Sequence, residues 1–204
     1  MVNANEKPRW FFYFGWVALN VIAVILAWYI AWEIISQVTN IVGDTIQVGG
    51  ESHITEDLLY MNVLIPIIGL LTGVFQYILL RRYLPHMGWW VAATLVGWLS
   101  PLLIRFIPSA TNTFLIMLGM LLIAATMVLP QWWMLHQRVG HAFWWLIAFG
   151  LGWGMVGLLN LVTSEPLPVL LAMALMPAIT TGIAWWLLLD WLPNRELKSS
   201  PTSL

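Results

Sequence analysis

The segment Gln76–Trp98, QYILLRRYLPHMGWWVAATLVGW, occurs a second time at Gln131–Trp153 as QWWMLHQRVGHAFWWLIAFGLGW. The two copies lie 55 residues apart and share eight identities in 23 positions without a gap. Each copy places apolar residues on both sides of a short basic turn, which is typical of two membrane helices joined as a hairpin. The repeat therefore predicts two helical hairpins, at about residues 58–107 and 113–163.

A third partial copy extends this pattern. Thr72-Gly73, shifted by 109 residues, falls on Thr181-Gly182, and Gly15-Trp16 is similar to Gly97-Trp98. If the first and last apolar segments complete a third hairpin, the bundle has approximate threefold symmetry about the membrane normal, as parallel repeats have in some transporters. The match at Gly15-Trp16 covers only two residues, so this arrangement stays open at this point.

The composition indicates that lipid surrounds the chain. Hydrophobic residues make up 61% of it and charged residues 8%, against about 25% charged in soluble domains. Six stretches approach the roughly 20 apolar residues that cross a bilayer: Trp10–Gln37, Leu58–Leu80, Trp89–Ile107, Thr113–Met134, Phe143–Thr163 and Pro168–Leu192. We expect an all-α bundle of six transmembrane helices that forms a single domain over residues 1–204. The net charge of -1 offers no basic field for nucleic acid.

The charged residues predict the direction of these spans. Seven of the eight basic residues fall on one side, and they are Lys7, Arg9, Arg81, Arg82, Arg138, Arg195 and Lys198. By the positive-inside rule both termini are then cytoplasmic. Most tryptophans near the cytoplasmic ends, including the pairs Trp89-Trp90 and Trp144-Trp145, are expected to form an anchoring belt at the headgroups.

The outer connection at residues 38–57 is the one long link between spans. It is polar and acidic, and at about 20 residues it is long enough to be a docking loop. Its alternation at Thr45–Val48 is a weak strand signal. Its candidate docking residues are Asp44, Glu51, His53 and Glu56.

The repeat also marks residues inside the spans. Polar groups in membrane helices usually face the bundle interior, so Gln76 and Gln131 are expected to bond neighbouring helices or to contact a ligand. Small residues let helices approach closely. The candidate packing residues near the bilayer middle are Gly97, Trp98, Gly152 and Trp153.

Few residues suggest chemistry. Glu33 is expected to reach water or to pair with Arg105, with proton relay or cation binding as the alternative. Asp190 is expected to pair with one of the arginines Arg81, Arg82 and Arg138. The chain has no cysteine, which removes disulfides, thiolate metal sites and a cysteine nucleophile. Motifs of hydrolases, nucleotide-binding proteins and zinc enzymes are missing. We therefore expect no enzyme activity, no metal and no resident cofactor, although a bound lipid or quinone is possible.

The doubled pattern Gln76…Arg81-Arg82…Trp89-Trp90…Gly97-Trp98 resembles a family of small bacterial membrane proteins built from such hairpins, over roughly residues 66–192. The resemblance implies a fold and a place in a bacterial inner membrane, but no activity. Our leading hypothesis is a non-catalytic accessory subunit of a larger membrane complex, by analogy in an electron-transport assembly such as alternative complex III. Its partners would be other membrane subunits and the lipid bilayer. The first alternative is a small transporter, or a protein that binds lipid or quinone, with a site around Gln76, Gln131, Asn62 and Asn160. A weaker alternative is a membrane-embedded enzyme that uses Glu33 and Arg105.

Overall fold

A computed structural model describes residues 9–84, 87–100, 102, 113–163 and 166–189 of the chain. These residues form six helices and one strand pair, in the order α1 (Arg9–Val42), β1 (Thr45–Val48), β2 (Glu51–Ile54), α2 (Thr55–Leu80), α3 (Trp89–Leu99), α4 (Thr113–His136), α5 (Phe143–Val162) and α6 (Pro166–Leu189). The expected all-α class is confirmed, and a short hairpin is added to it.

The apolar runs form helices because a helix satisfies its own backbone groups, which lipid does not. Three helical stretches within the described residues are long and apolar enough to cross a membrane: Trp10–Val42, Thr55–Leu80 and Leu171–Leu189. The helices at Trp89–Leu99 and Phe143–Leu159 are apolar but shorter. The third expected span continues to Ile107, and most of residues 100–107 lie outside the described part of the chain.

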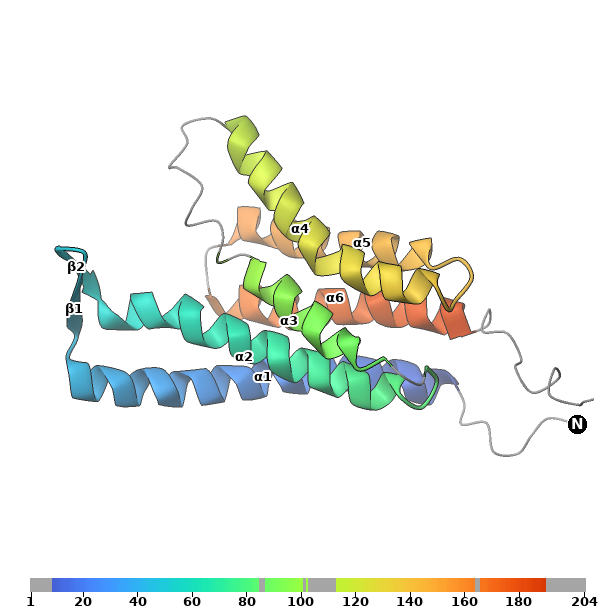
Figure 1. Cartoon of the computed structure of the whole chain (residues 1–204), viewed down its shortest axis with the longest axis horizontal. Coiled ribbons are helices and arrows are strands. Elements are labelled where there is room, and N and C mark those ends of the chain that lie inside the picture. The colour runs from blue at the N-terminus through green and yellow to red at the C-terminus, as the bar shows by residue number, and fades with distance from the viewer. Residues whose placement is uncertain (1–8, 85–86, 101, 103–112, 164–165, 190–204) are drawn as a thin grey trace, which may run out of the picture.

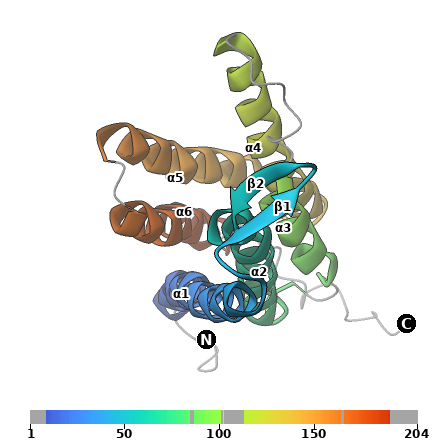
Figure 2. The same ribbon diagram turned by 90° about the vertical axis from the view of Figure 1, so that its left-hand side faces the viewer.

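The helices form a closed ring in chain order. Each packs against the next one, and α6 packs against α1 (Figure 2). Successive helices run in opposite directions, so the start of α1 and the two turns α2–α3 and α4–α5 lie at one end of the molecule (Figure 1). This end carries Arg81, Arg82 and Arg138 and is called the basic end below. The strand pair lies at the opposite end, where the first half of α4 inclines away from the other helices.

The outer connection at residues 38–57 contains a strand pair, and the strand signal at Thr45–Val48 is confirmed by β1. Helix α1 continues to Val42, and β1 pairs antiparallel with β2 in a hairpin. Gly49 and Gly50 turn the chain at φ 63° and 90°, the backbone that a tight two-residue turn requires. Thr55 fastens the base of the hairpin, because its Oγ1 donates to the carbonyl oxygen of Gly43 at 2.7 Å.

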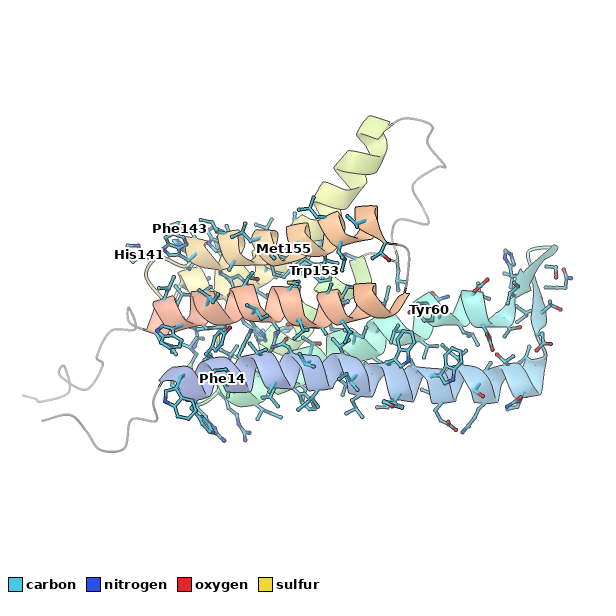
Figure 3. The ribbon with its side chains drawn as sticks, turned by 180° about the vertical axis from the view of Figure 1, so that it is seen from behind. Phe14, Tyr60, His141, Phe143, Trp153 and Met155 are labelled. Carbon is cyan, nitrogen blue, oxygen red and sulfur yellow. The ribbon has the colours of Figure 1, made fainter. Side chains whose placement is uncertain are left out.

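Exposed apolar side chains cover the ring from outside. Many large aliphatic and aromatic residues of α1, α5 and α6 are exposed, and Phe14, Phe143 and Met155 project outward in Figure 3. The interior is also largely apolar, and a smaller set of buried amides and hydroxyls, including Gln76 and Gln131, lies within it. An outer surface this apolar is expected where lipid is the solvent.

Candidate functional site

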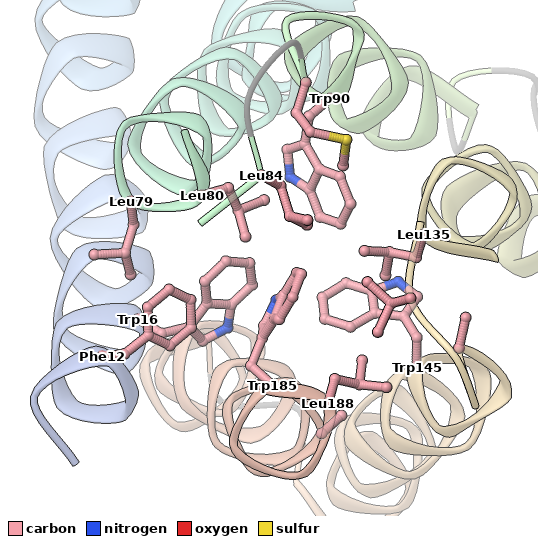
Figure 4. Close-up of a cluster of buried hydrophobic side chains, with 14 of the residues drawn as sticks. Phe12, Trp16, Leu79, Leu80, Leu84, Trp90, Leu135, Trp145, Trp185 and Leu188 are labelled. Carbon is pink, nitrogen blue, oxygen red and sulfur yellow. The ribbon is translucent and has the colours of Figure 1, made fainter. Parts of the chain in front are cut away.

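Four tryptophans from four helices meet at the centre of the ring near its basic end (Figure 4). Trp16, Trp90, Trp145 and Trp185 come from α1, α3, α5 and α6, and each is at most 1% exposed. Ring centroids of neighbouring members lie 5.5 to 6.4 Å apart, mostly edge to face, which is a favourable aromatic geometry. We call these four residues the tryptophan layer.

The tryptophan layer corrects the expected anchoring belt. Trp90 and Trp145 fill the core, whereas Trp89 is 78% exposed and Trp144 is half-buried. Consecutive helical residues point about 100° apart, so one member of each pair faces inward and the other outward. Exposed Trp10 and Trp133 remain at the surface as a belt residue would, and Trp191 lies outside the described residues.

A layer of buried polar side chains lies one helical turn farther from the basic end. Gln76 connects three helices: its Nε2 donates to Asn20 Oδ1 on α1 at 2.7 Å, and its Oε1 accepts from Trp90 Nε1 on α3 at 2.8 Å. Gln131 on α4 donates through Nε2 to Thr94 Oγ1 on α3 at 2.8 Å. Both repeated glutamines therefore bond neighbouring helices.

The bonds continue from α1 to α6. Trp16 Nε1 donates to Thr181 Oγ1 at 3.0 Å, and the Thr181 hydroxyl donates to the carbonyl oxygen of Pro177 in its own helix. Side-chain bonds thus link α4, α3, α2, α1 and α6 in sequence.

A cavity of about 50 Å³ lies beside the polar layer. Trp145 lines it toward the basic end, and Trp98 and Trp153, in contact with a 5.5 Å centroid separation, line it on the far side. Its polar lining consists of Asn20, Thr72, Gln76, Thr94, Gln131 and Thr181. Three polar atoms of residues that line the cavity, Thr72 Oγ1, Gln131 Oε1 and Trp145 Nε1, have no hydrogen-bond partner in the described part of the chain.

Glycines set the close approaches of the ring. A Cβ on Gly97 would lie 2.8 Å from Met127 Cα on α4, and one on Gly152 would lie 2.6 Å from Pro177 Cα on α6. Gly69 is equally tight, with Trp98 Cβ at 2.7 Å. Gly154 meets nothing within 4 Å. The two repeated glycines thus occupy contacts where no side chain fits.

Of the candidate charged residues, Glu33 and Arg81 are described, and both are exposed away from this centre. Glu33 is exposed and its Oε1 accepts from Gln37 Nε2 at 2.7 Å, while its expected partner Arg105 lies outside the described residues. Arg81 is exposed, and its expected partner Asp190 is also outside the described part. No group of three or more His, Asp or Glu residues in the described segments is placed to hold a metal ion.

The candidate docking residues lie on the strand pair and its flanks. Asp44 and Glu56 are exposed and His53 is half-buried, while Glu51 pairs with Val48 across the strands. The alternative ligand site is only partly assembled. Gln76 and Gln131 line the cavity, but Asn62 is exposed and donates to Leu58 O of its own helix at 2.6 Å, and the side chain of Asn160 is outside those described.

Sequence reasoning missed the threonines and the register of α1. Thr72, Thr94 and Thr181 join the polar layer, and Trp16 lies in the layer of Trp90 and Trp145, not with Trp98 as the Gly-Trp match suggested. The detectable signal was spacing, because Asn20 follows Trp16 by four residues as Thr94 follows Trp90. The chain matches no protein-family model, no curated protein and no solved structure.

Proposed function

We propose that this chain is a non-catalytic accessory subunit of a larger bacterial membrane complex. It would span the inner membrane six times with both termini in the cytoplasm. The apolar outer surface of the ring, the seven-to-one division of basic residues and the arginines at the basic end support this placement. A role in electron transport rests on analogy alone.

The observation that carries the subunit role is the length of α1, together with the exposed apolar residues at its end and on the strand pair. Helix α1 has 34 residues, which gives a length of about 51 Å at 1.5 Å per residue, against a hydrocarbon core of about 30 Å. With its start at the cytoplasmic headgroups, its last turns and the hairpin extend past the lipid. Ile41, Val42, Val48 and Ile54 are 84%, 48%, 46% and 57% exposed there.

These four residues, called the apolar tip below, need a physical account. Lipid does not cover side chains outside the bilayer, and exposed apolar patches in water mark contact surfaces. Exposed carboxylates at Asp44 and Glu56 flank the tip, so the partner surface would be apolar with a basic rim. A second membrane subunit with an extramembrane domain has this geometry.

The alternative quinone or lipid site inside the ring is less favoured. The central cavity of about 50 Å³ is far below the roughly 300–1,000 Å³ of sites for molecules of that size. The tryptophan layer, packed from four helices, occupies the rest of the centre at the basic end.

Gentle solubilisation of native membranes tests the proposal. The chain should be recovered at fixed stoichiometry with its partner, and the pair Ile41→Ser and Ile54→Ser should remove the partner while tryptophan fluorescence stays native. Gln47→Ser, at an exposed polar site of the same hairpin, is the matched control and should keep the partner. A monodisperse monomer from native membranes, or a double variant that still binds, would refute the proposal.

A further inference from the structure

The two repeated hairpins carry the same indole–amide pair but only one of them makes the bond. In the first, Trp90 Nε1 donates to Gln76 Oε1 at 2.8 Å. The second has Trp145 and Gln131 at the same 14-residue separation. Yet Trp145 Nε1 and Gln131 Oε1 are both buried and without a partner among the described residues, and both residues line the cavity.

The rest of the arrangement is the same in both hairpins. The Nε2 of Gln76 donates to Asn20, four residues after Trp16, and the Nε2 of Gln131 donates to Thr94, four residues after Trp90. The Gln131 amide is therefore held as the Gln76 amide is, with its oxygen left over. The two hairpins differ in that the indole N–H of Trp145 and the amide oxygen of Gln131 are not bonded to each other.

The atoms around this gap specify the chemistry of what fills it. Trp145 Nε1 is a donor only, the Gln131 amide oxygen is an acceptor only, and the Thr72 hydroxyl can act as either. A hydroxyl group accepts one bond and donates another, so it can bridge the first two atoms. No charged residue lines the cavity, and a buried ion without a counter-charge is strongly disfavoured. The occupant is therefore neutral.

We propose that the cavity binds a neutral hydroxyl group that bridges Trp145 Nε1 and Gln131 Oε1, with Thr72 as a third contact. Three side chains form the site, and they are 1%, 4% and 6% exposed in that order. Its volume of about 50 Å³ has room for a few water molecules at roughly 10–15 Å³ each, or for the hydroxyl end of one small alcohol or lipid glycerol. This site does not depend on any partner protein.

Indole N–H signals of the full chain in lipid nanodiscs test the proposal. With ¹⁵N-tryptophan, the Trp145 indole proton should show a cross-relaxation peak to bound water. A peak to the glyceryl protons of added glycerol or of lipid would instead identify an organic hydroxyl as the source. Trp90 is equally buried but bonded directly to Gln76, so it is the matched control and should show neither peak.

Gln131→Met should abolish the peak at Trp145 and leave the Trp90 signal unchanged, because only the first loses its bridge. Assignment uses Trp145→Phe. If that variant does not fold, it uses the through-space contact of Trp145 with Trp185, whose ring centroids lie 5.8 Å apart. The absence of any hydroxyl contact at Trp145, or a direct contact between its indole proton and the Gln131 side chain that closes the gap, would overturn the proposal.

Discussion

Substitution of Gly97 by alanine probes the closest approach of α3 and α4. The new Cβ would lie 2.8 Å from Met127 Cα and 3.3 Å from its carbonyl oxygen. Ordinary carbon–carbon contacts lie at about 3.5–4.0 Å, so the two helices would have to separate locally by roughly 1 Å. Overpacking of this kind costs about 1–3 kcal/mol, and the better helix propensity of alanine returns about 0.5–1 kcal/mol. We therefore expect a net loss of about 1–2 kcal/mol in the free energy of unfolding.

Reversible unfolding in mixed micelles, with SDS as the denaturant and tryptophan fluorescence as the signal, measures this loss. Gly154→Ala is the matched control: it lies in an apolar helix with nothing within 4 Å, so it should be neutral or slightly stabilising. Because the clash is with the backbone of Met127, adding Met127→Ala should not restore stability. A Gly97→Ala protein as stable as the Gly154→Ala protein, or one rescued by trimming Met127, would refute the packing argument.

Three further outcomes follow from the structure. Gln76→Leu removes hydrogen bonds to two neighbouring helices. At about 0.6–1.7 kcal/mol for each interhelical bond, it should lower the SDS midpoint of unfolding by an amount equivalent to about 1–3 kcal/mol. An unchanged midpoint would contradict the stabilising role of the polar layer. Gly50→Val forces a β-branched residue into φ 90°, which costs about 1–3 kcal/mol. Amide hydrogen exchange should therefore become faster in the strand pair alone. Equal exchange rates in the variant and the unaltered protein would show that the turn tolerates a side chain. Because the chain has no cysteine, Arg82→Cys and Gln47→Cys each introduce a single labelling site. A membrane-impermeant maleimide should reach the first only from the cytoplasm and the second only from outside. Access to both from one side would rule out the proposed topology.

The apolar runs and the repeat were enough to predict most helix bounds. The observed α2, α4 and α5 begin or end within three residues of the expected spans, because a long apolar run in lipid can satisfy its backbone only as a helix. The repeated glutamines were also recognisable, because an amide in an apolar run needs a partner. These features depend on one segment at a time.

Features that depend on neighbouring segments were not predictable in the same way. The pair Trp89-Trp90 marks a helix end, but which indole turns inward depends on where the other helices lie. The G-x-x-x-G at Gly69 and Gly73 packs tightly against α3, whereas the one at Gly150 and Gly154 meets nothing within 4 Å, although the two sequences look alike. At the outer connection the alternation predicted β1 at Thr45–Val48, while the Gly-Gly dipeptide, which marks a two-residue turn, would also have predicted its pairing with β2.

Among neighbouring helices of the ring, α4 and α5 make the fewest contacts within the described residues. Their interface is called the α4–α5 seam. Side-chain bonds cross from α4 to α3, from α3 to α2, from α2 to α1 and from α1 to α6, and Gly152 brings α5 against α6. None of these bonds and none of these glycine contacts joins α4 to α5 directly. In lipid, apolar contact between helices is little more favourable than apolar contact with lipid. Hydrogen bonds and close packing therefore determine which helices stay associated. A hydroxyl between Gln131 and Trp145 would therefore supply the missing link, and its loss would weaken the ring first at this seam.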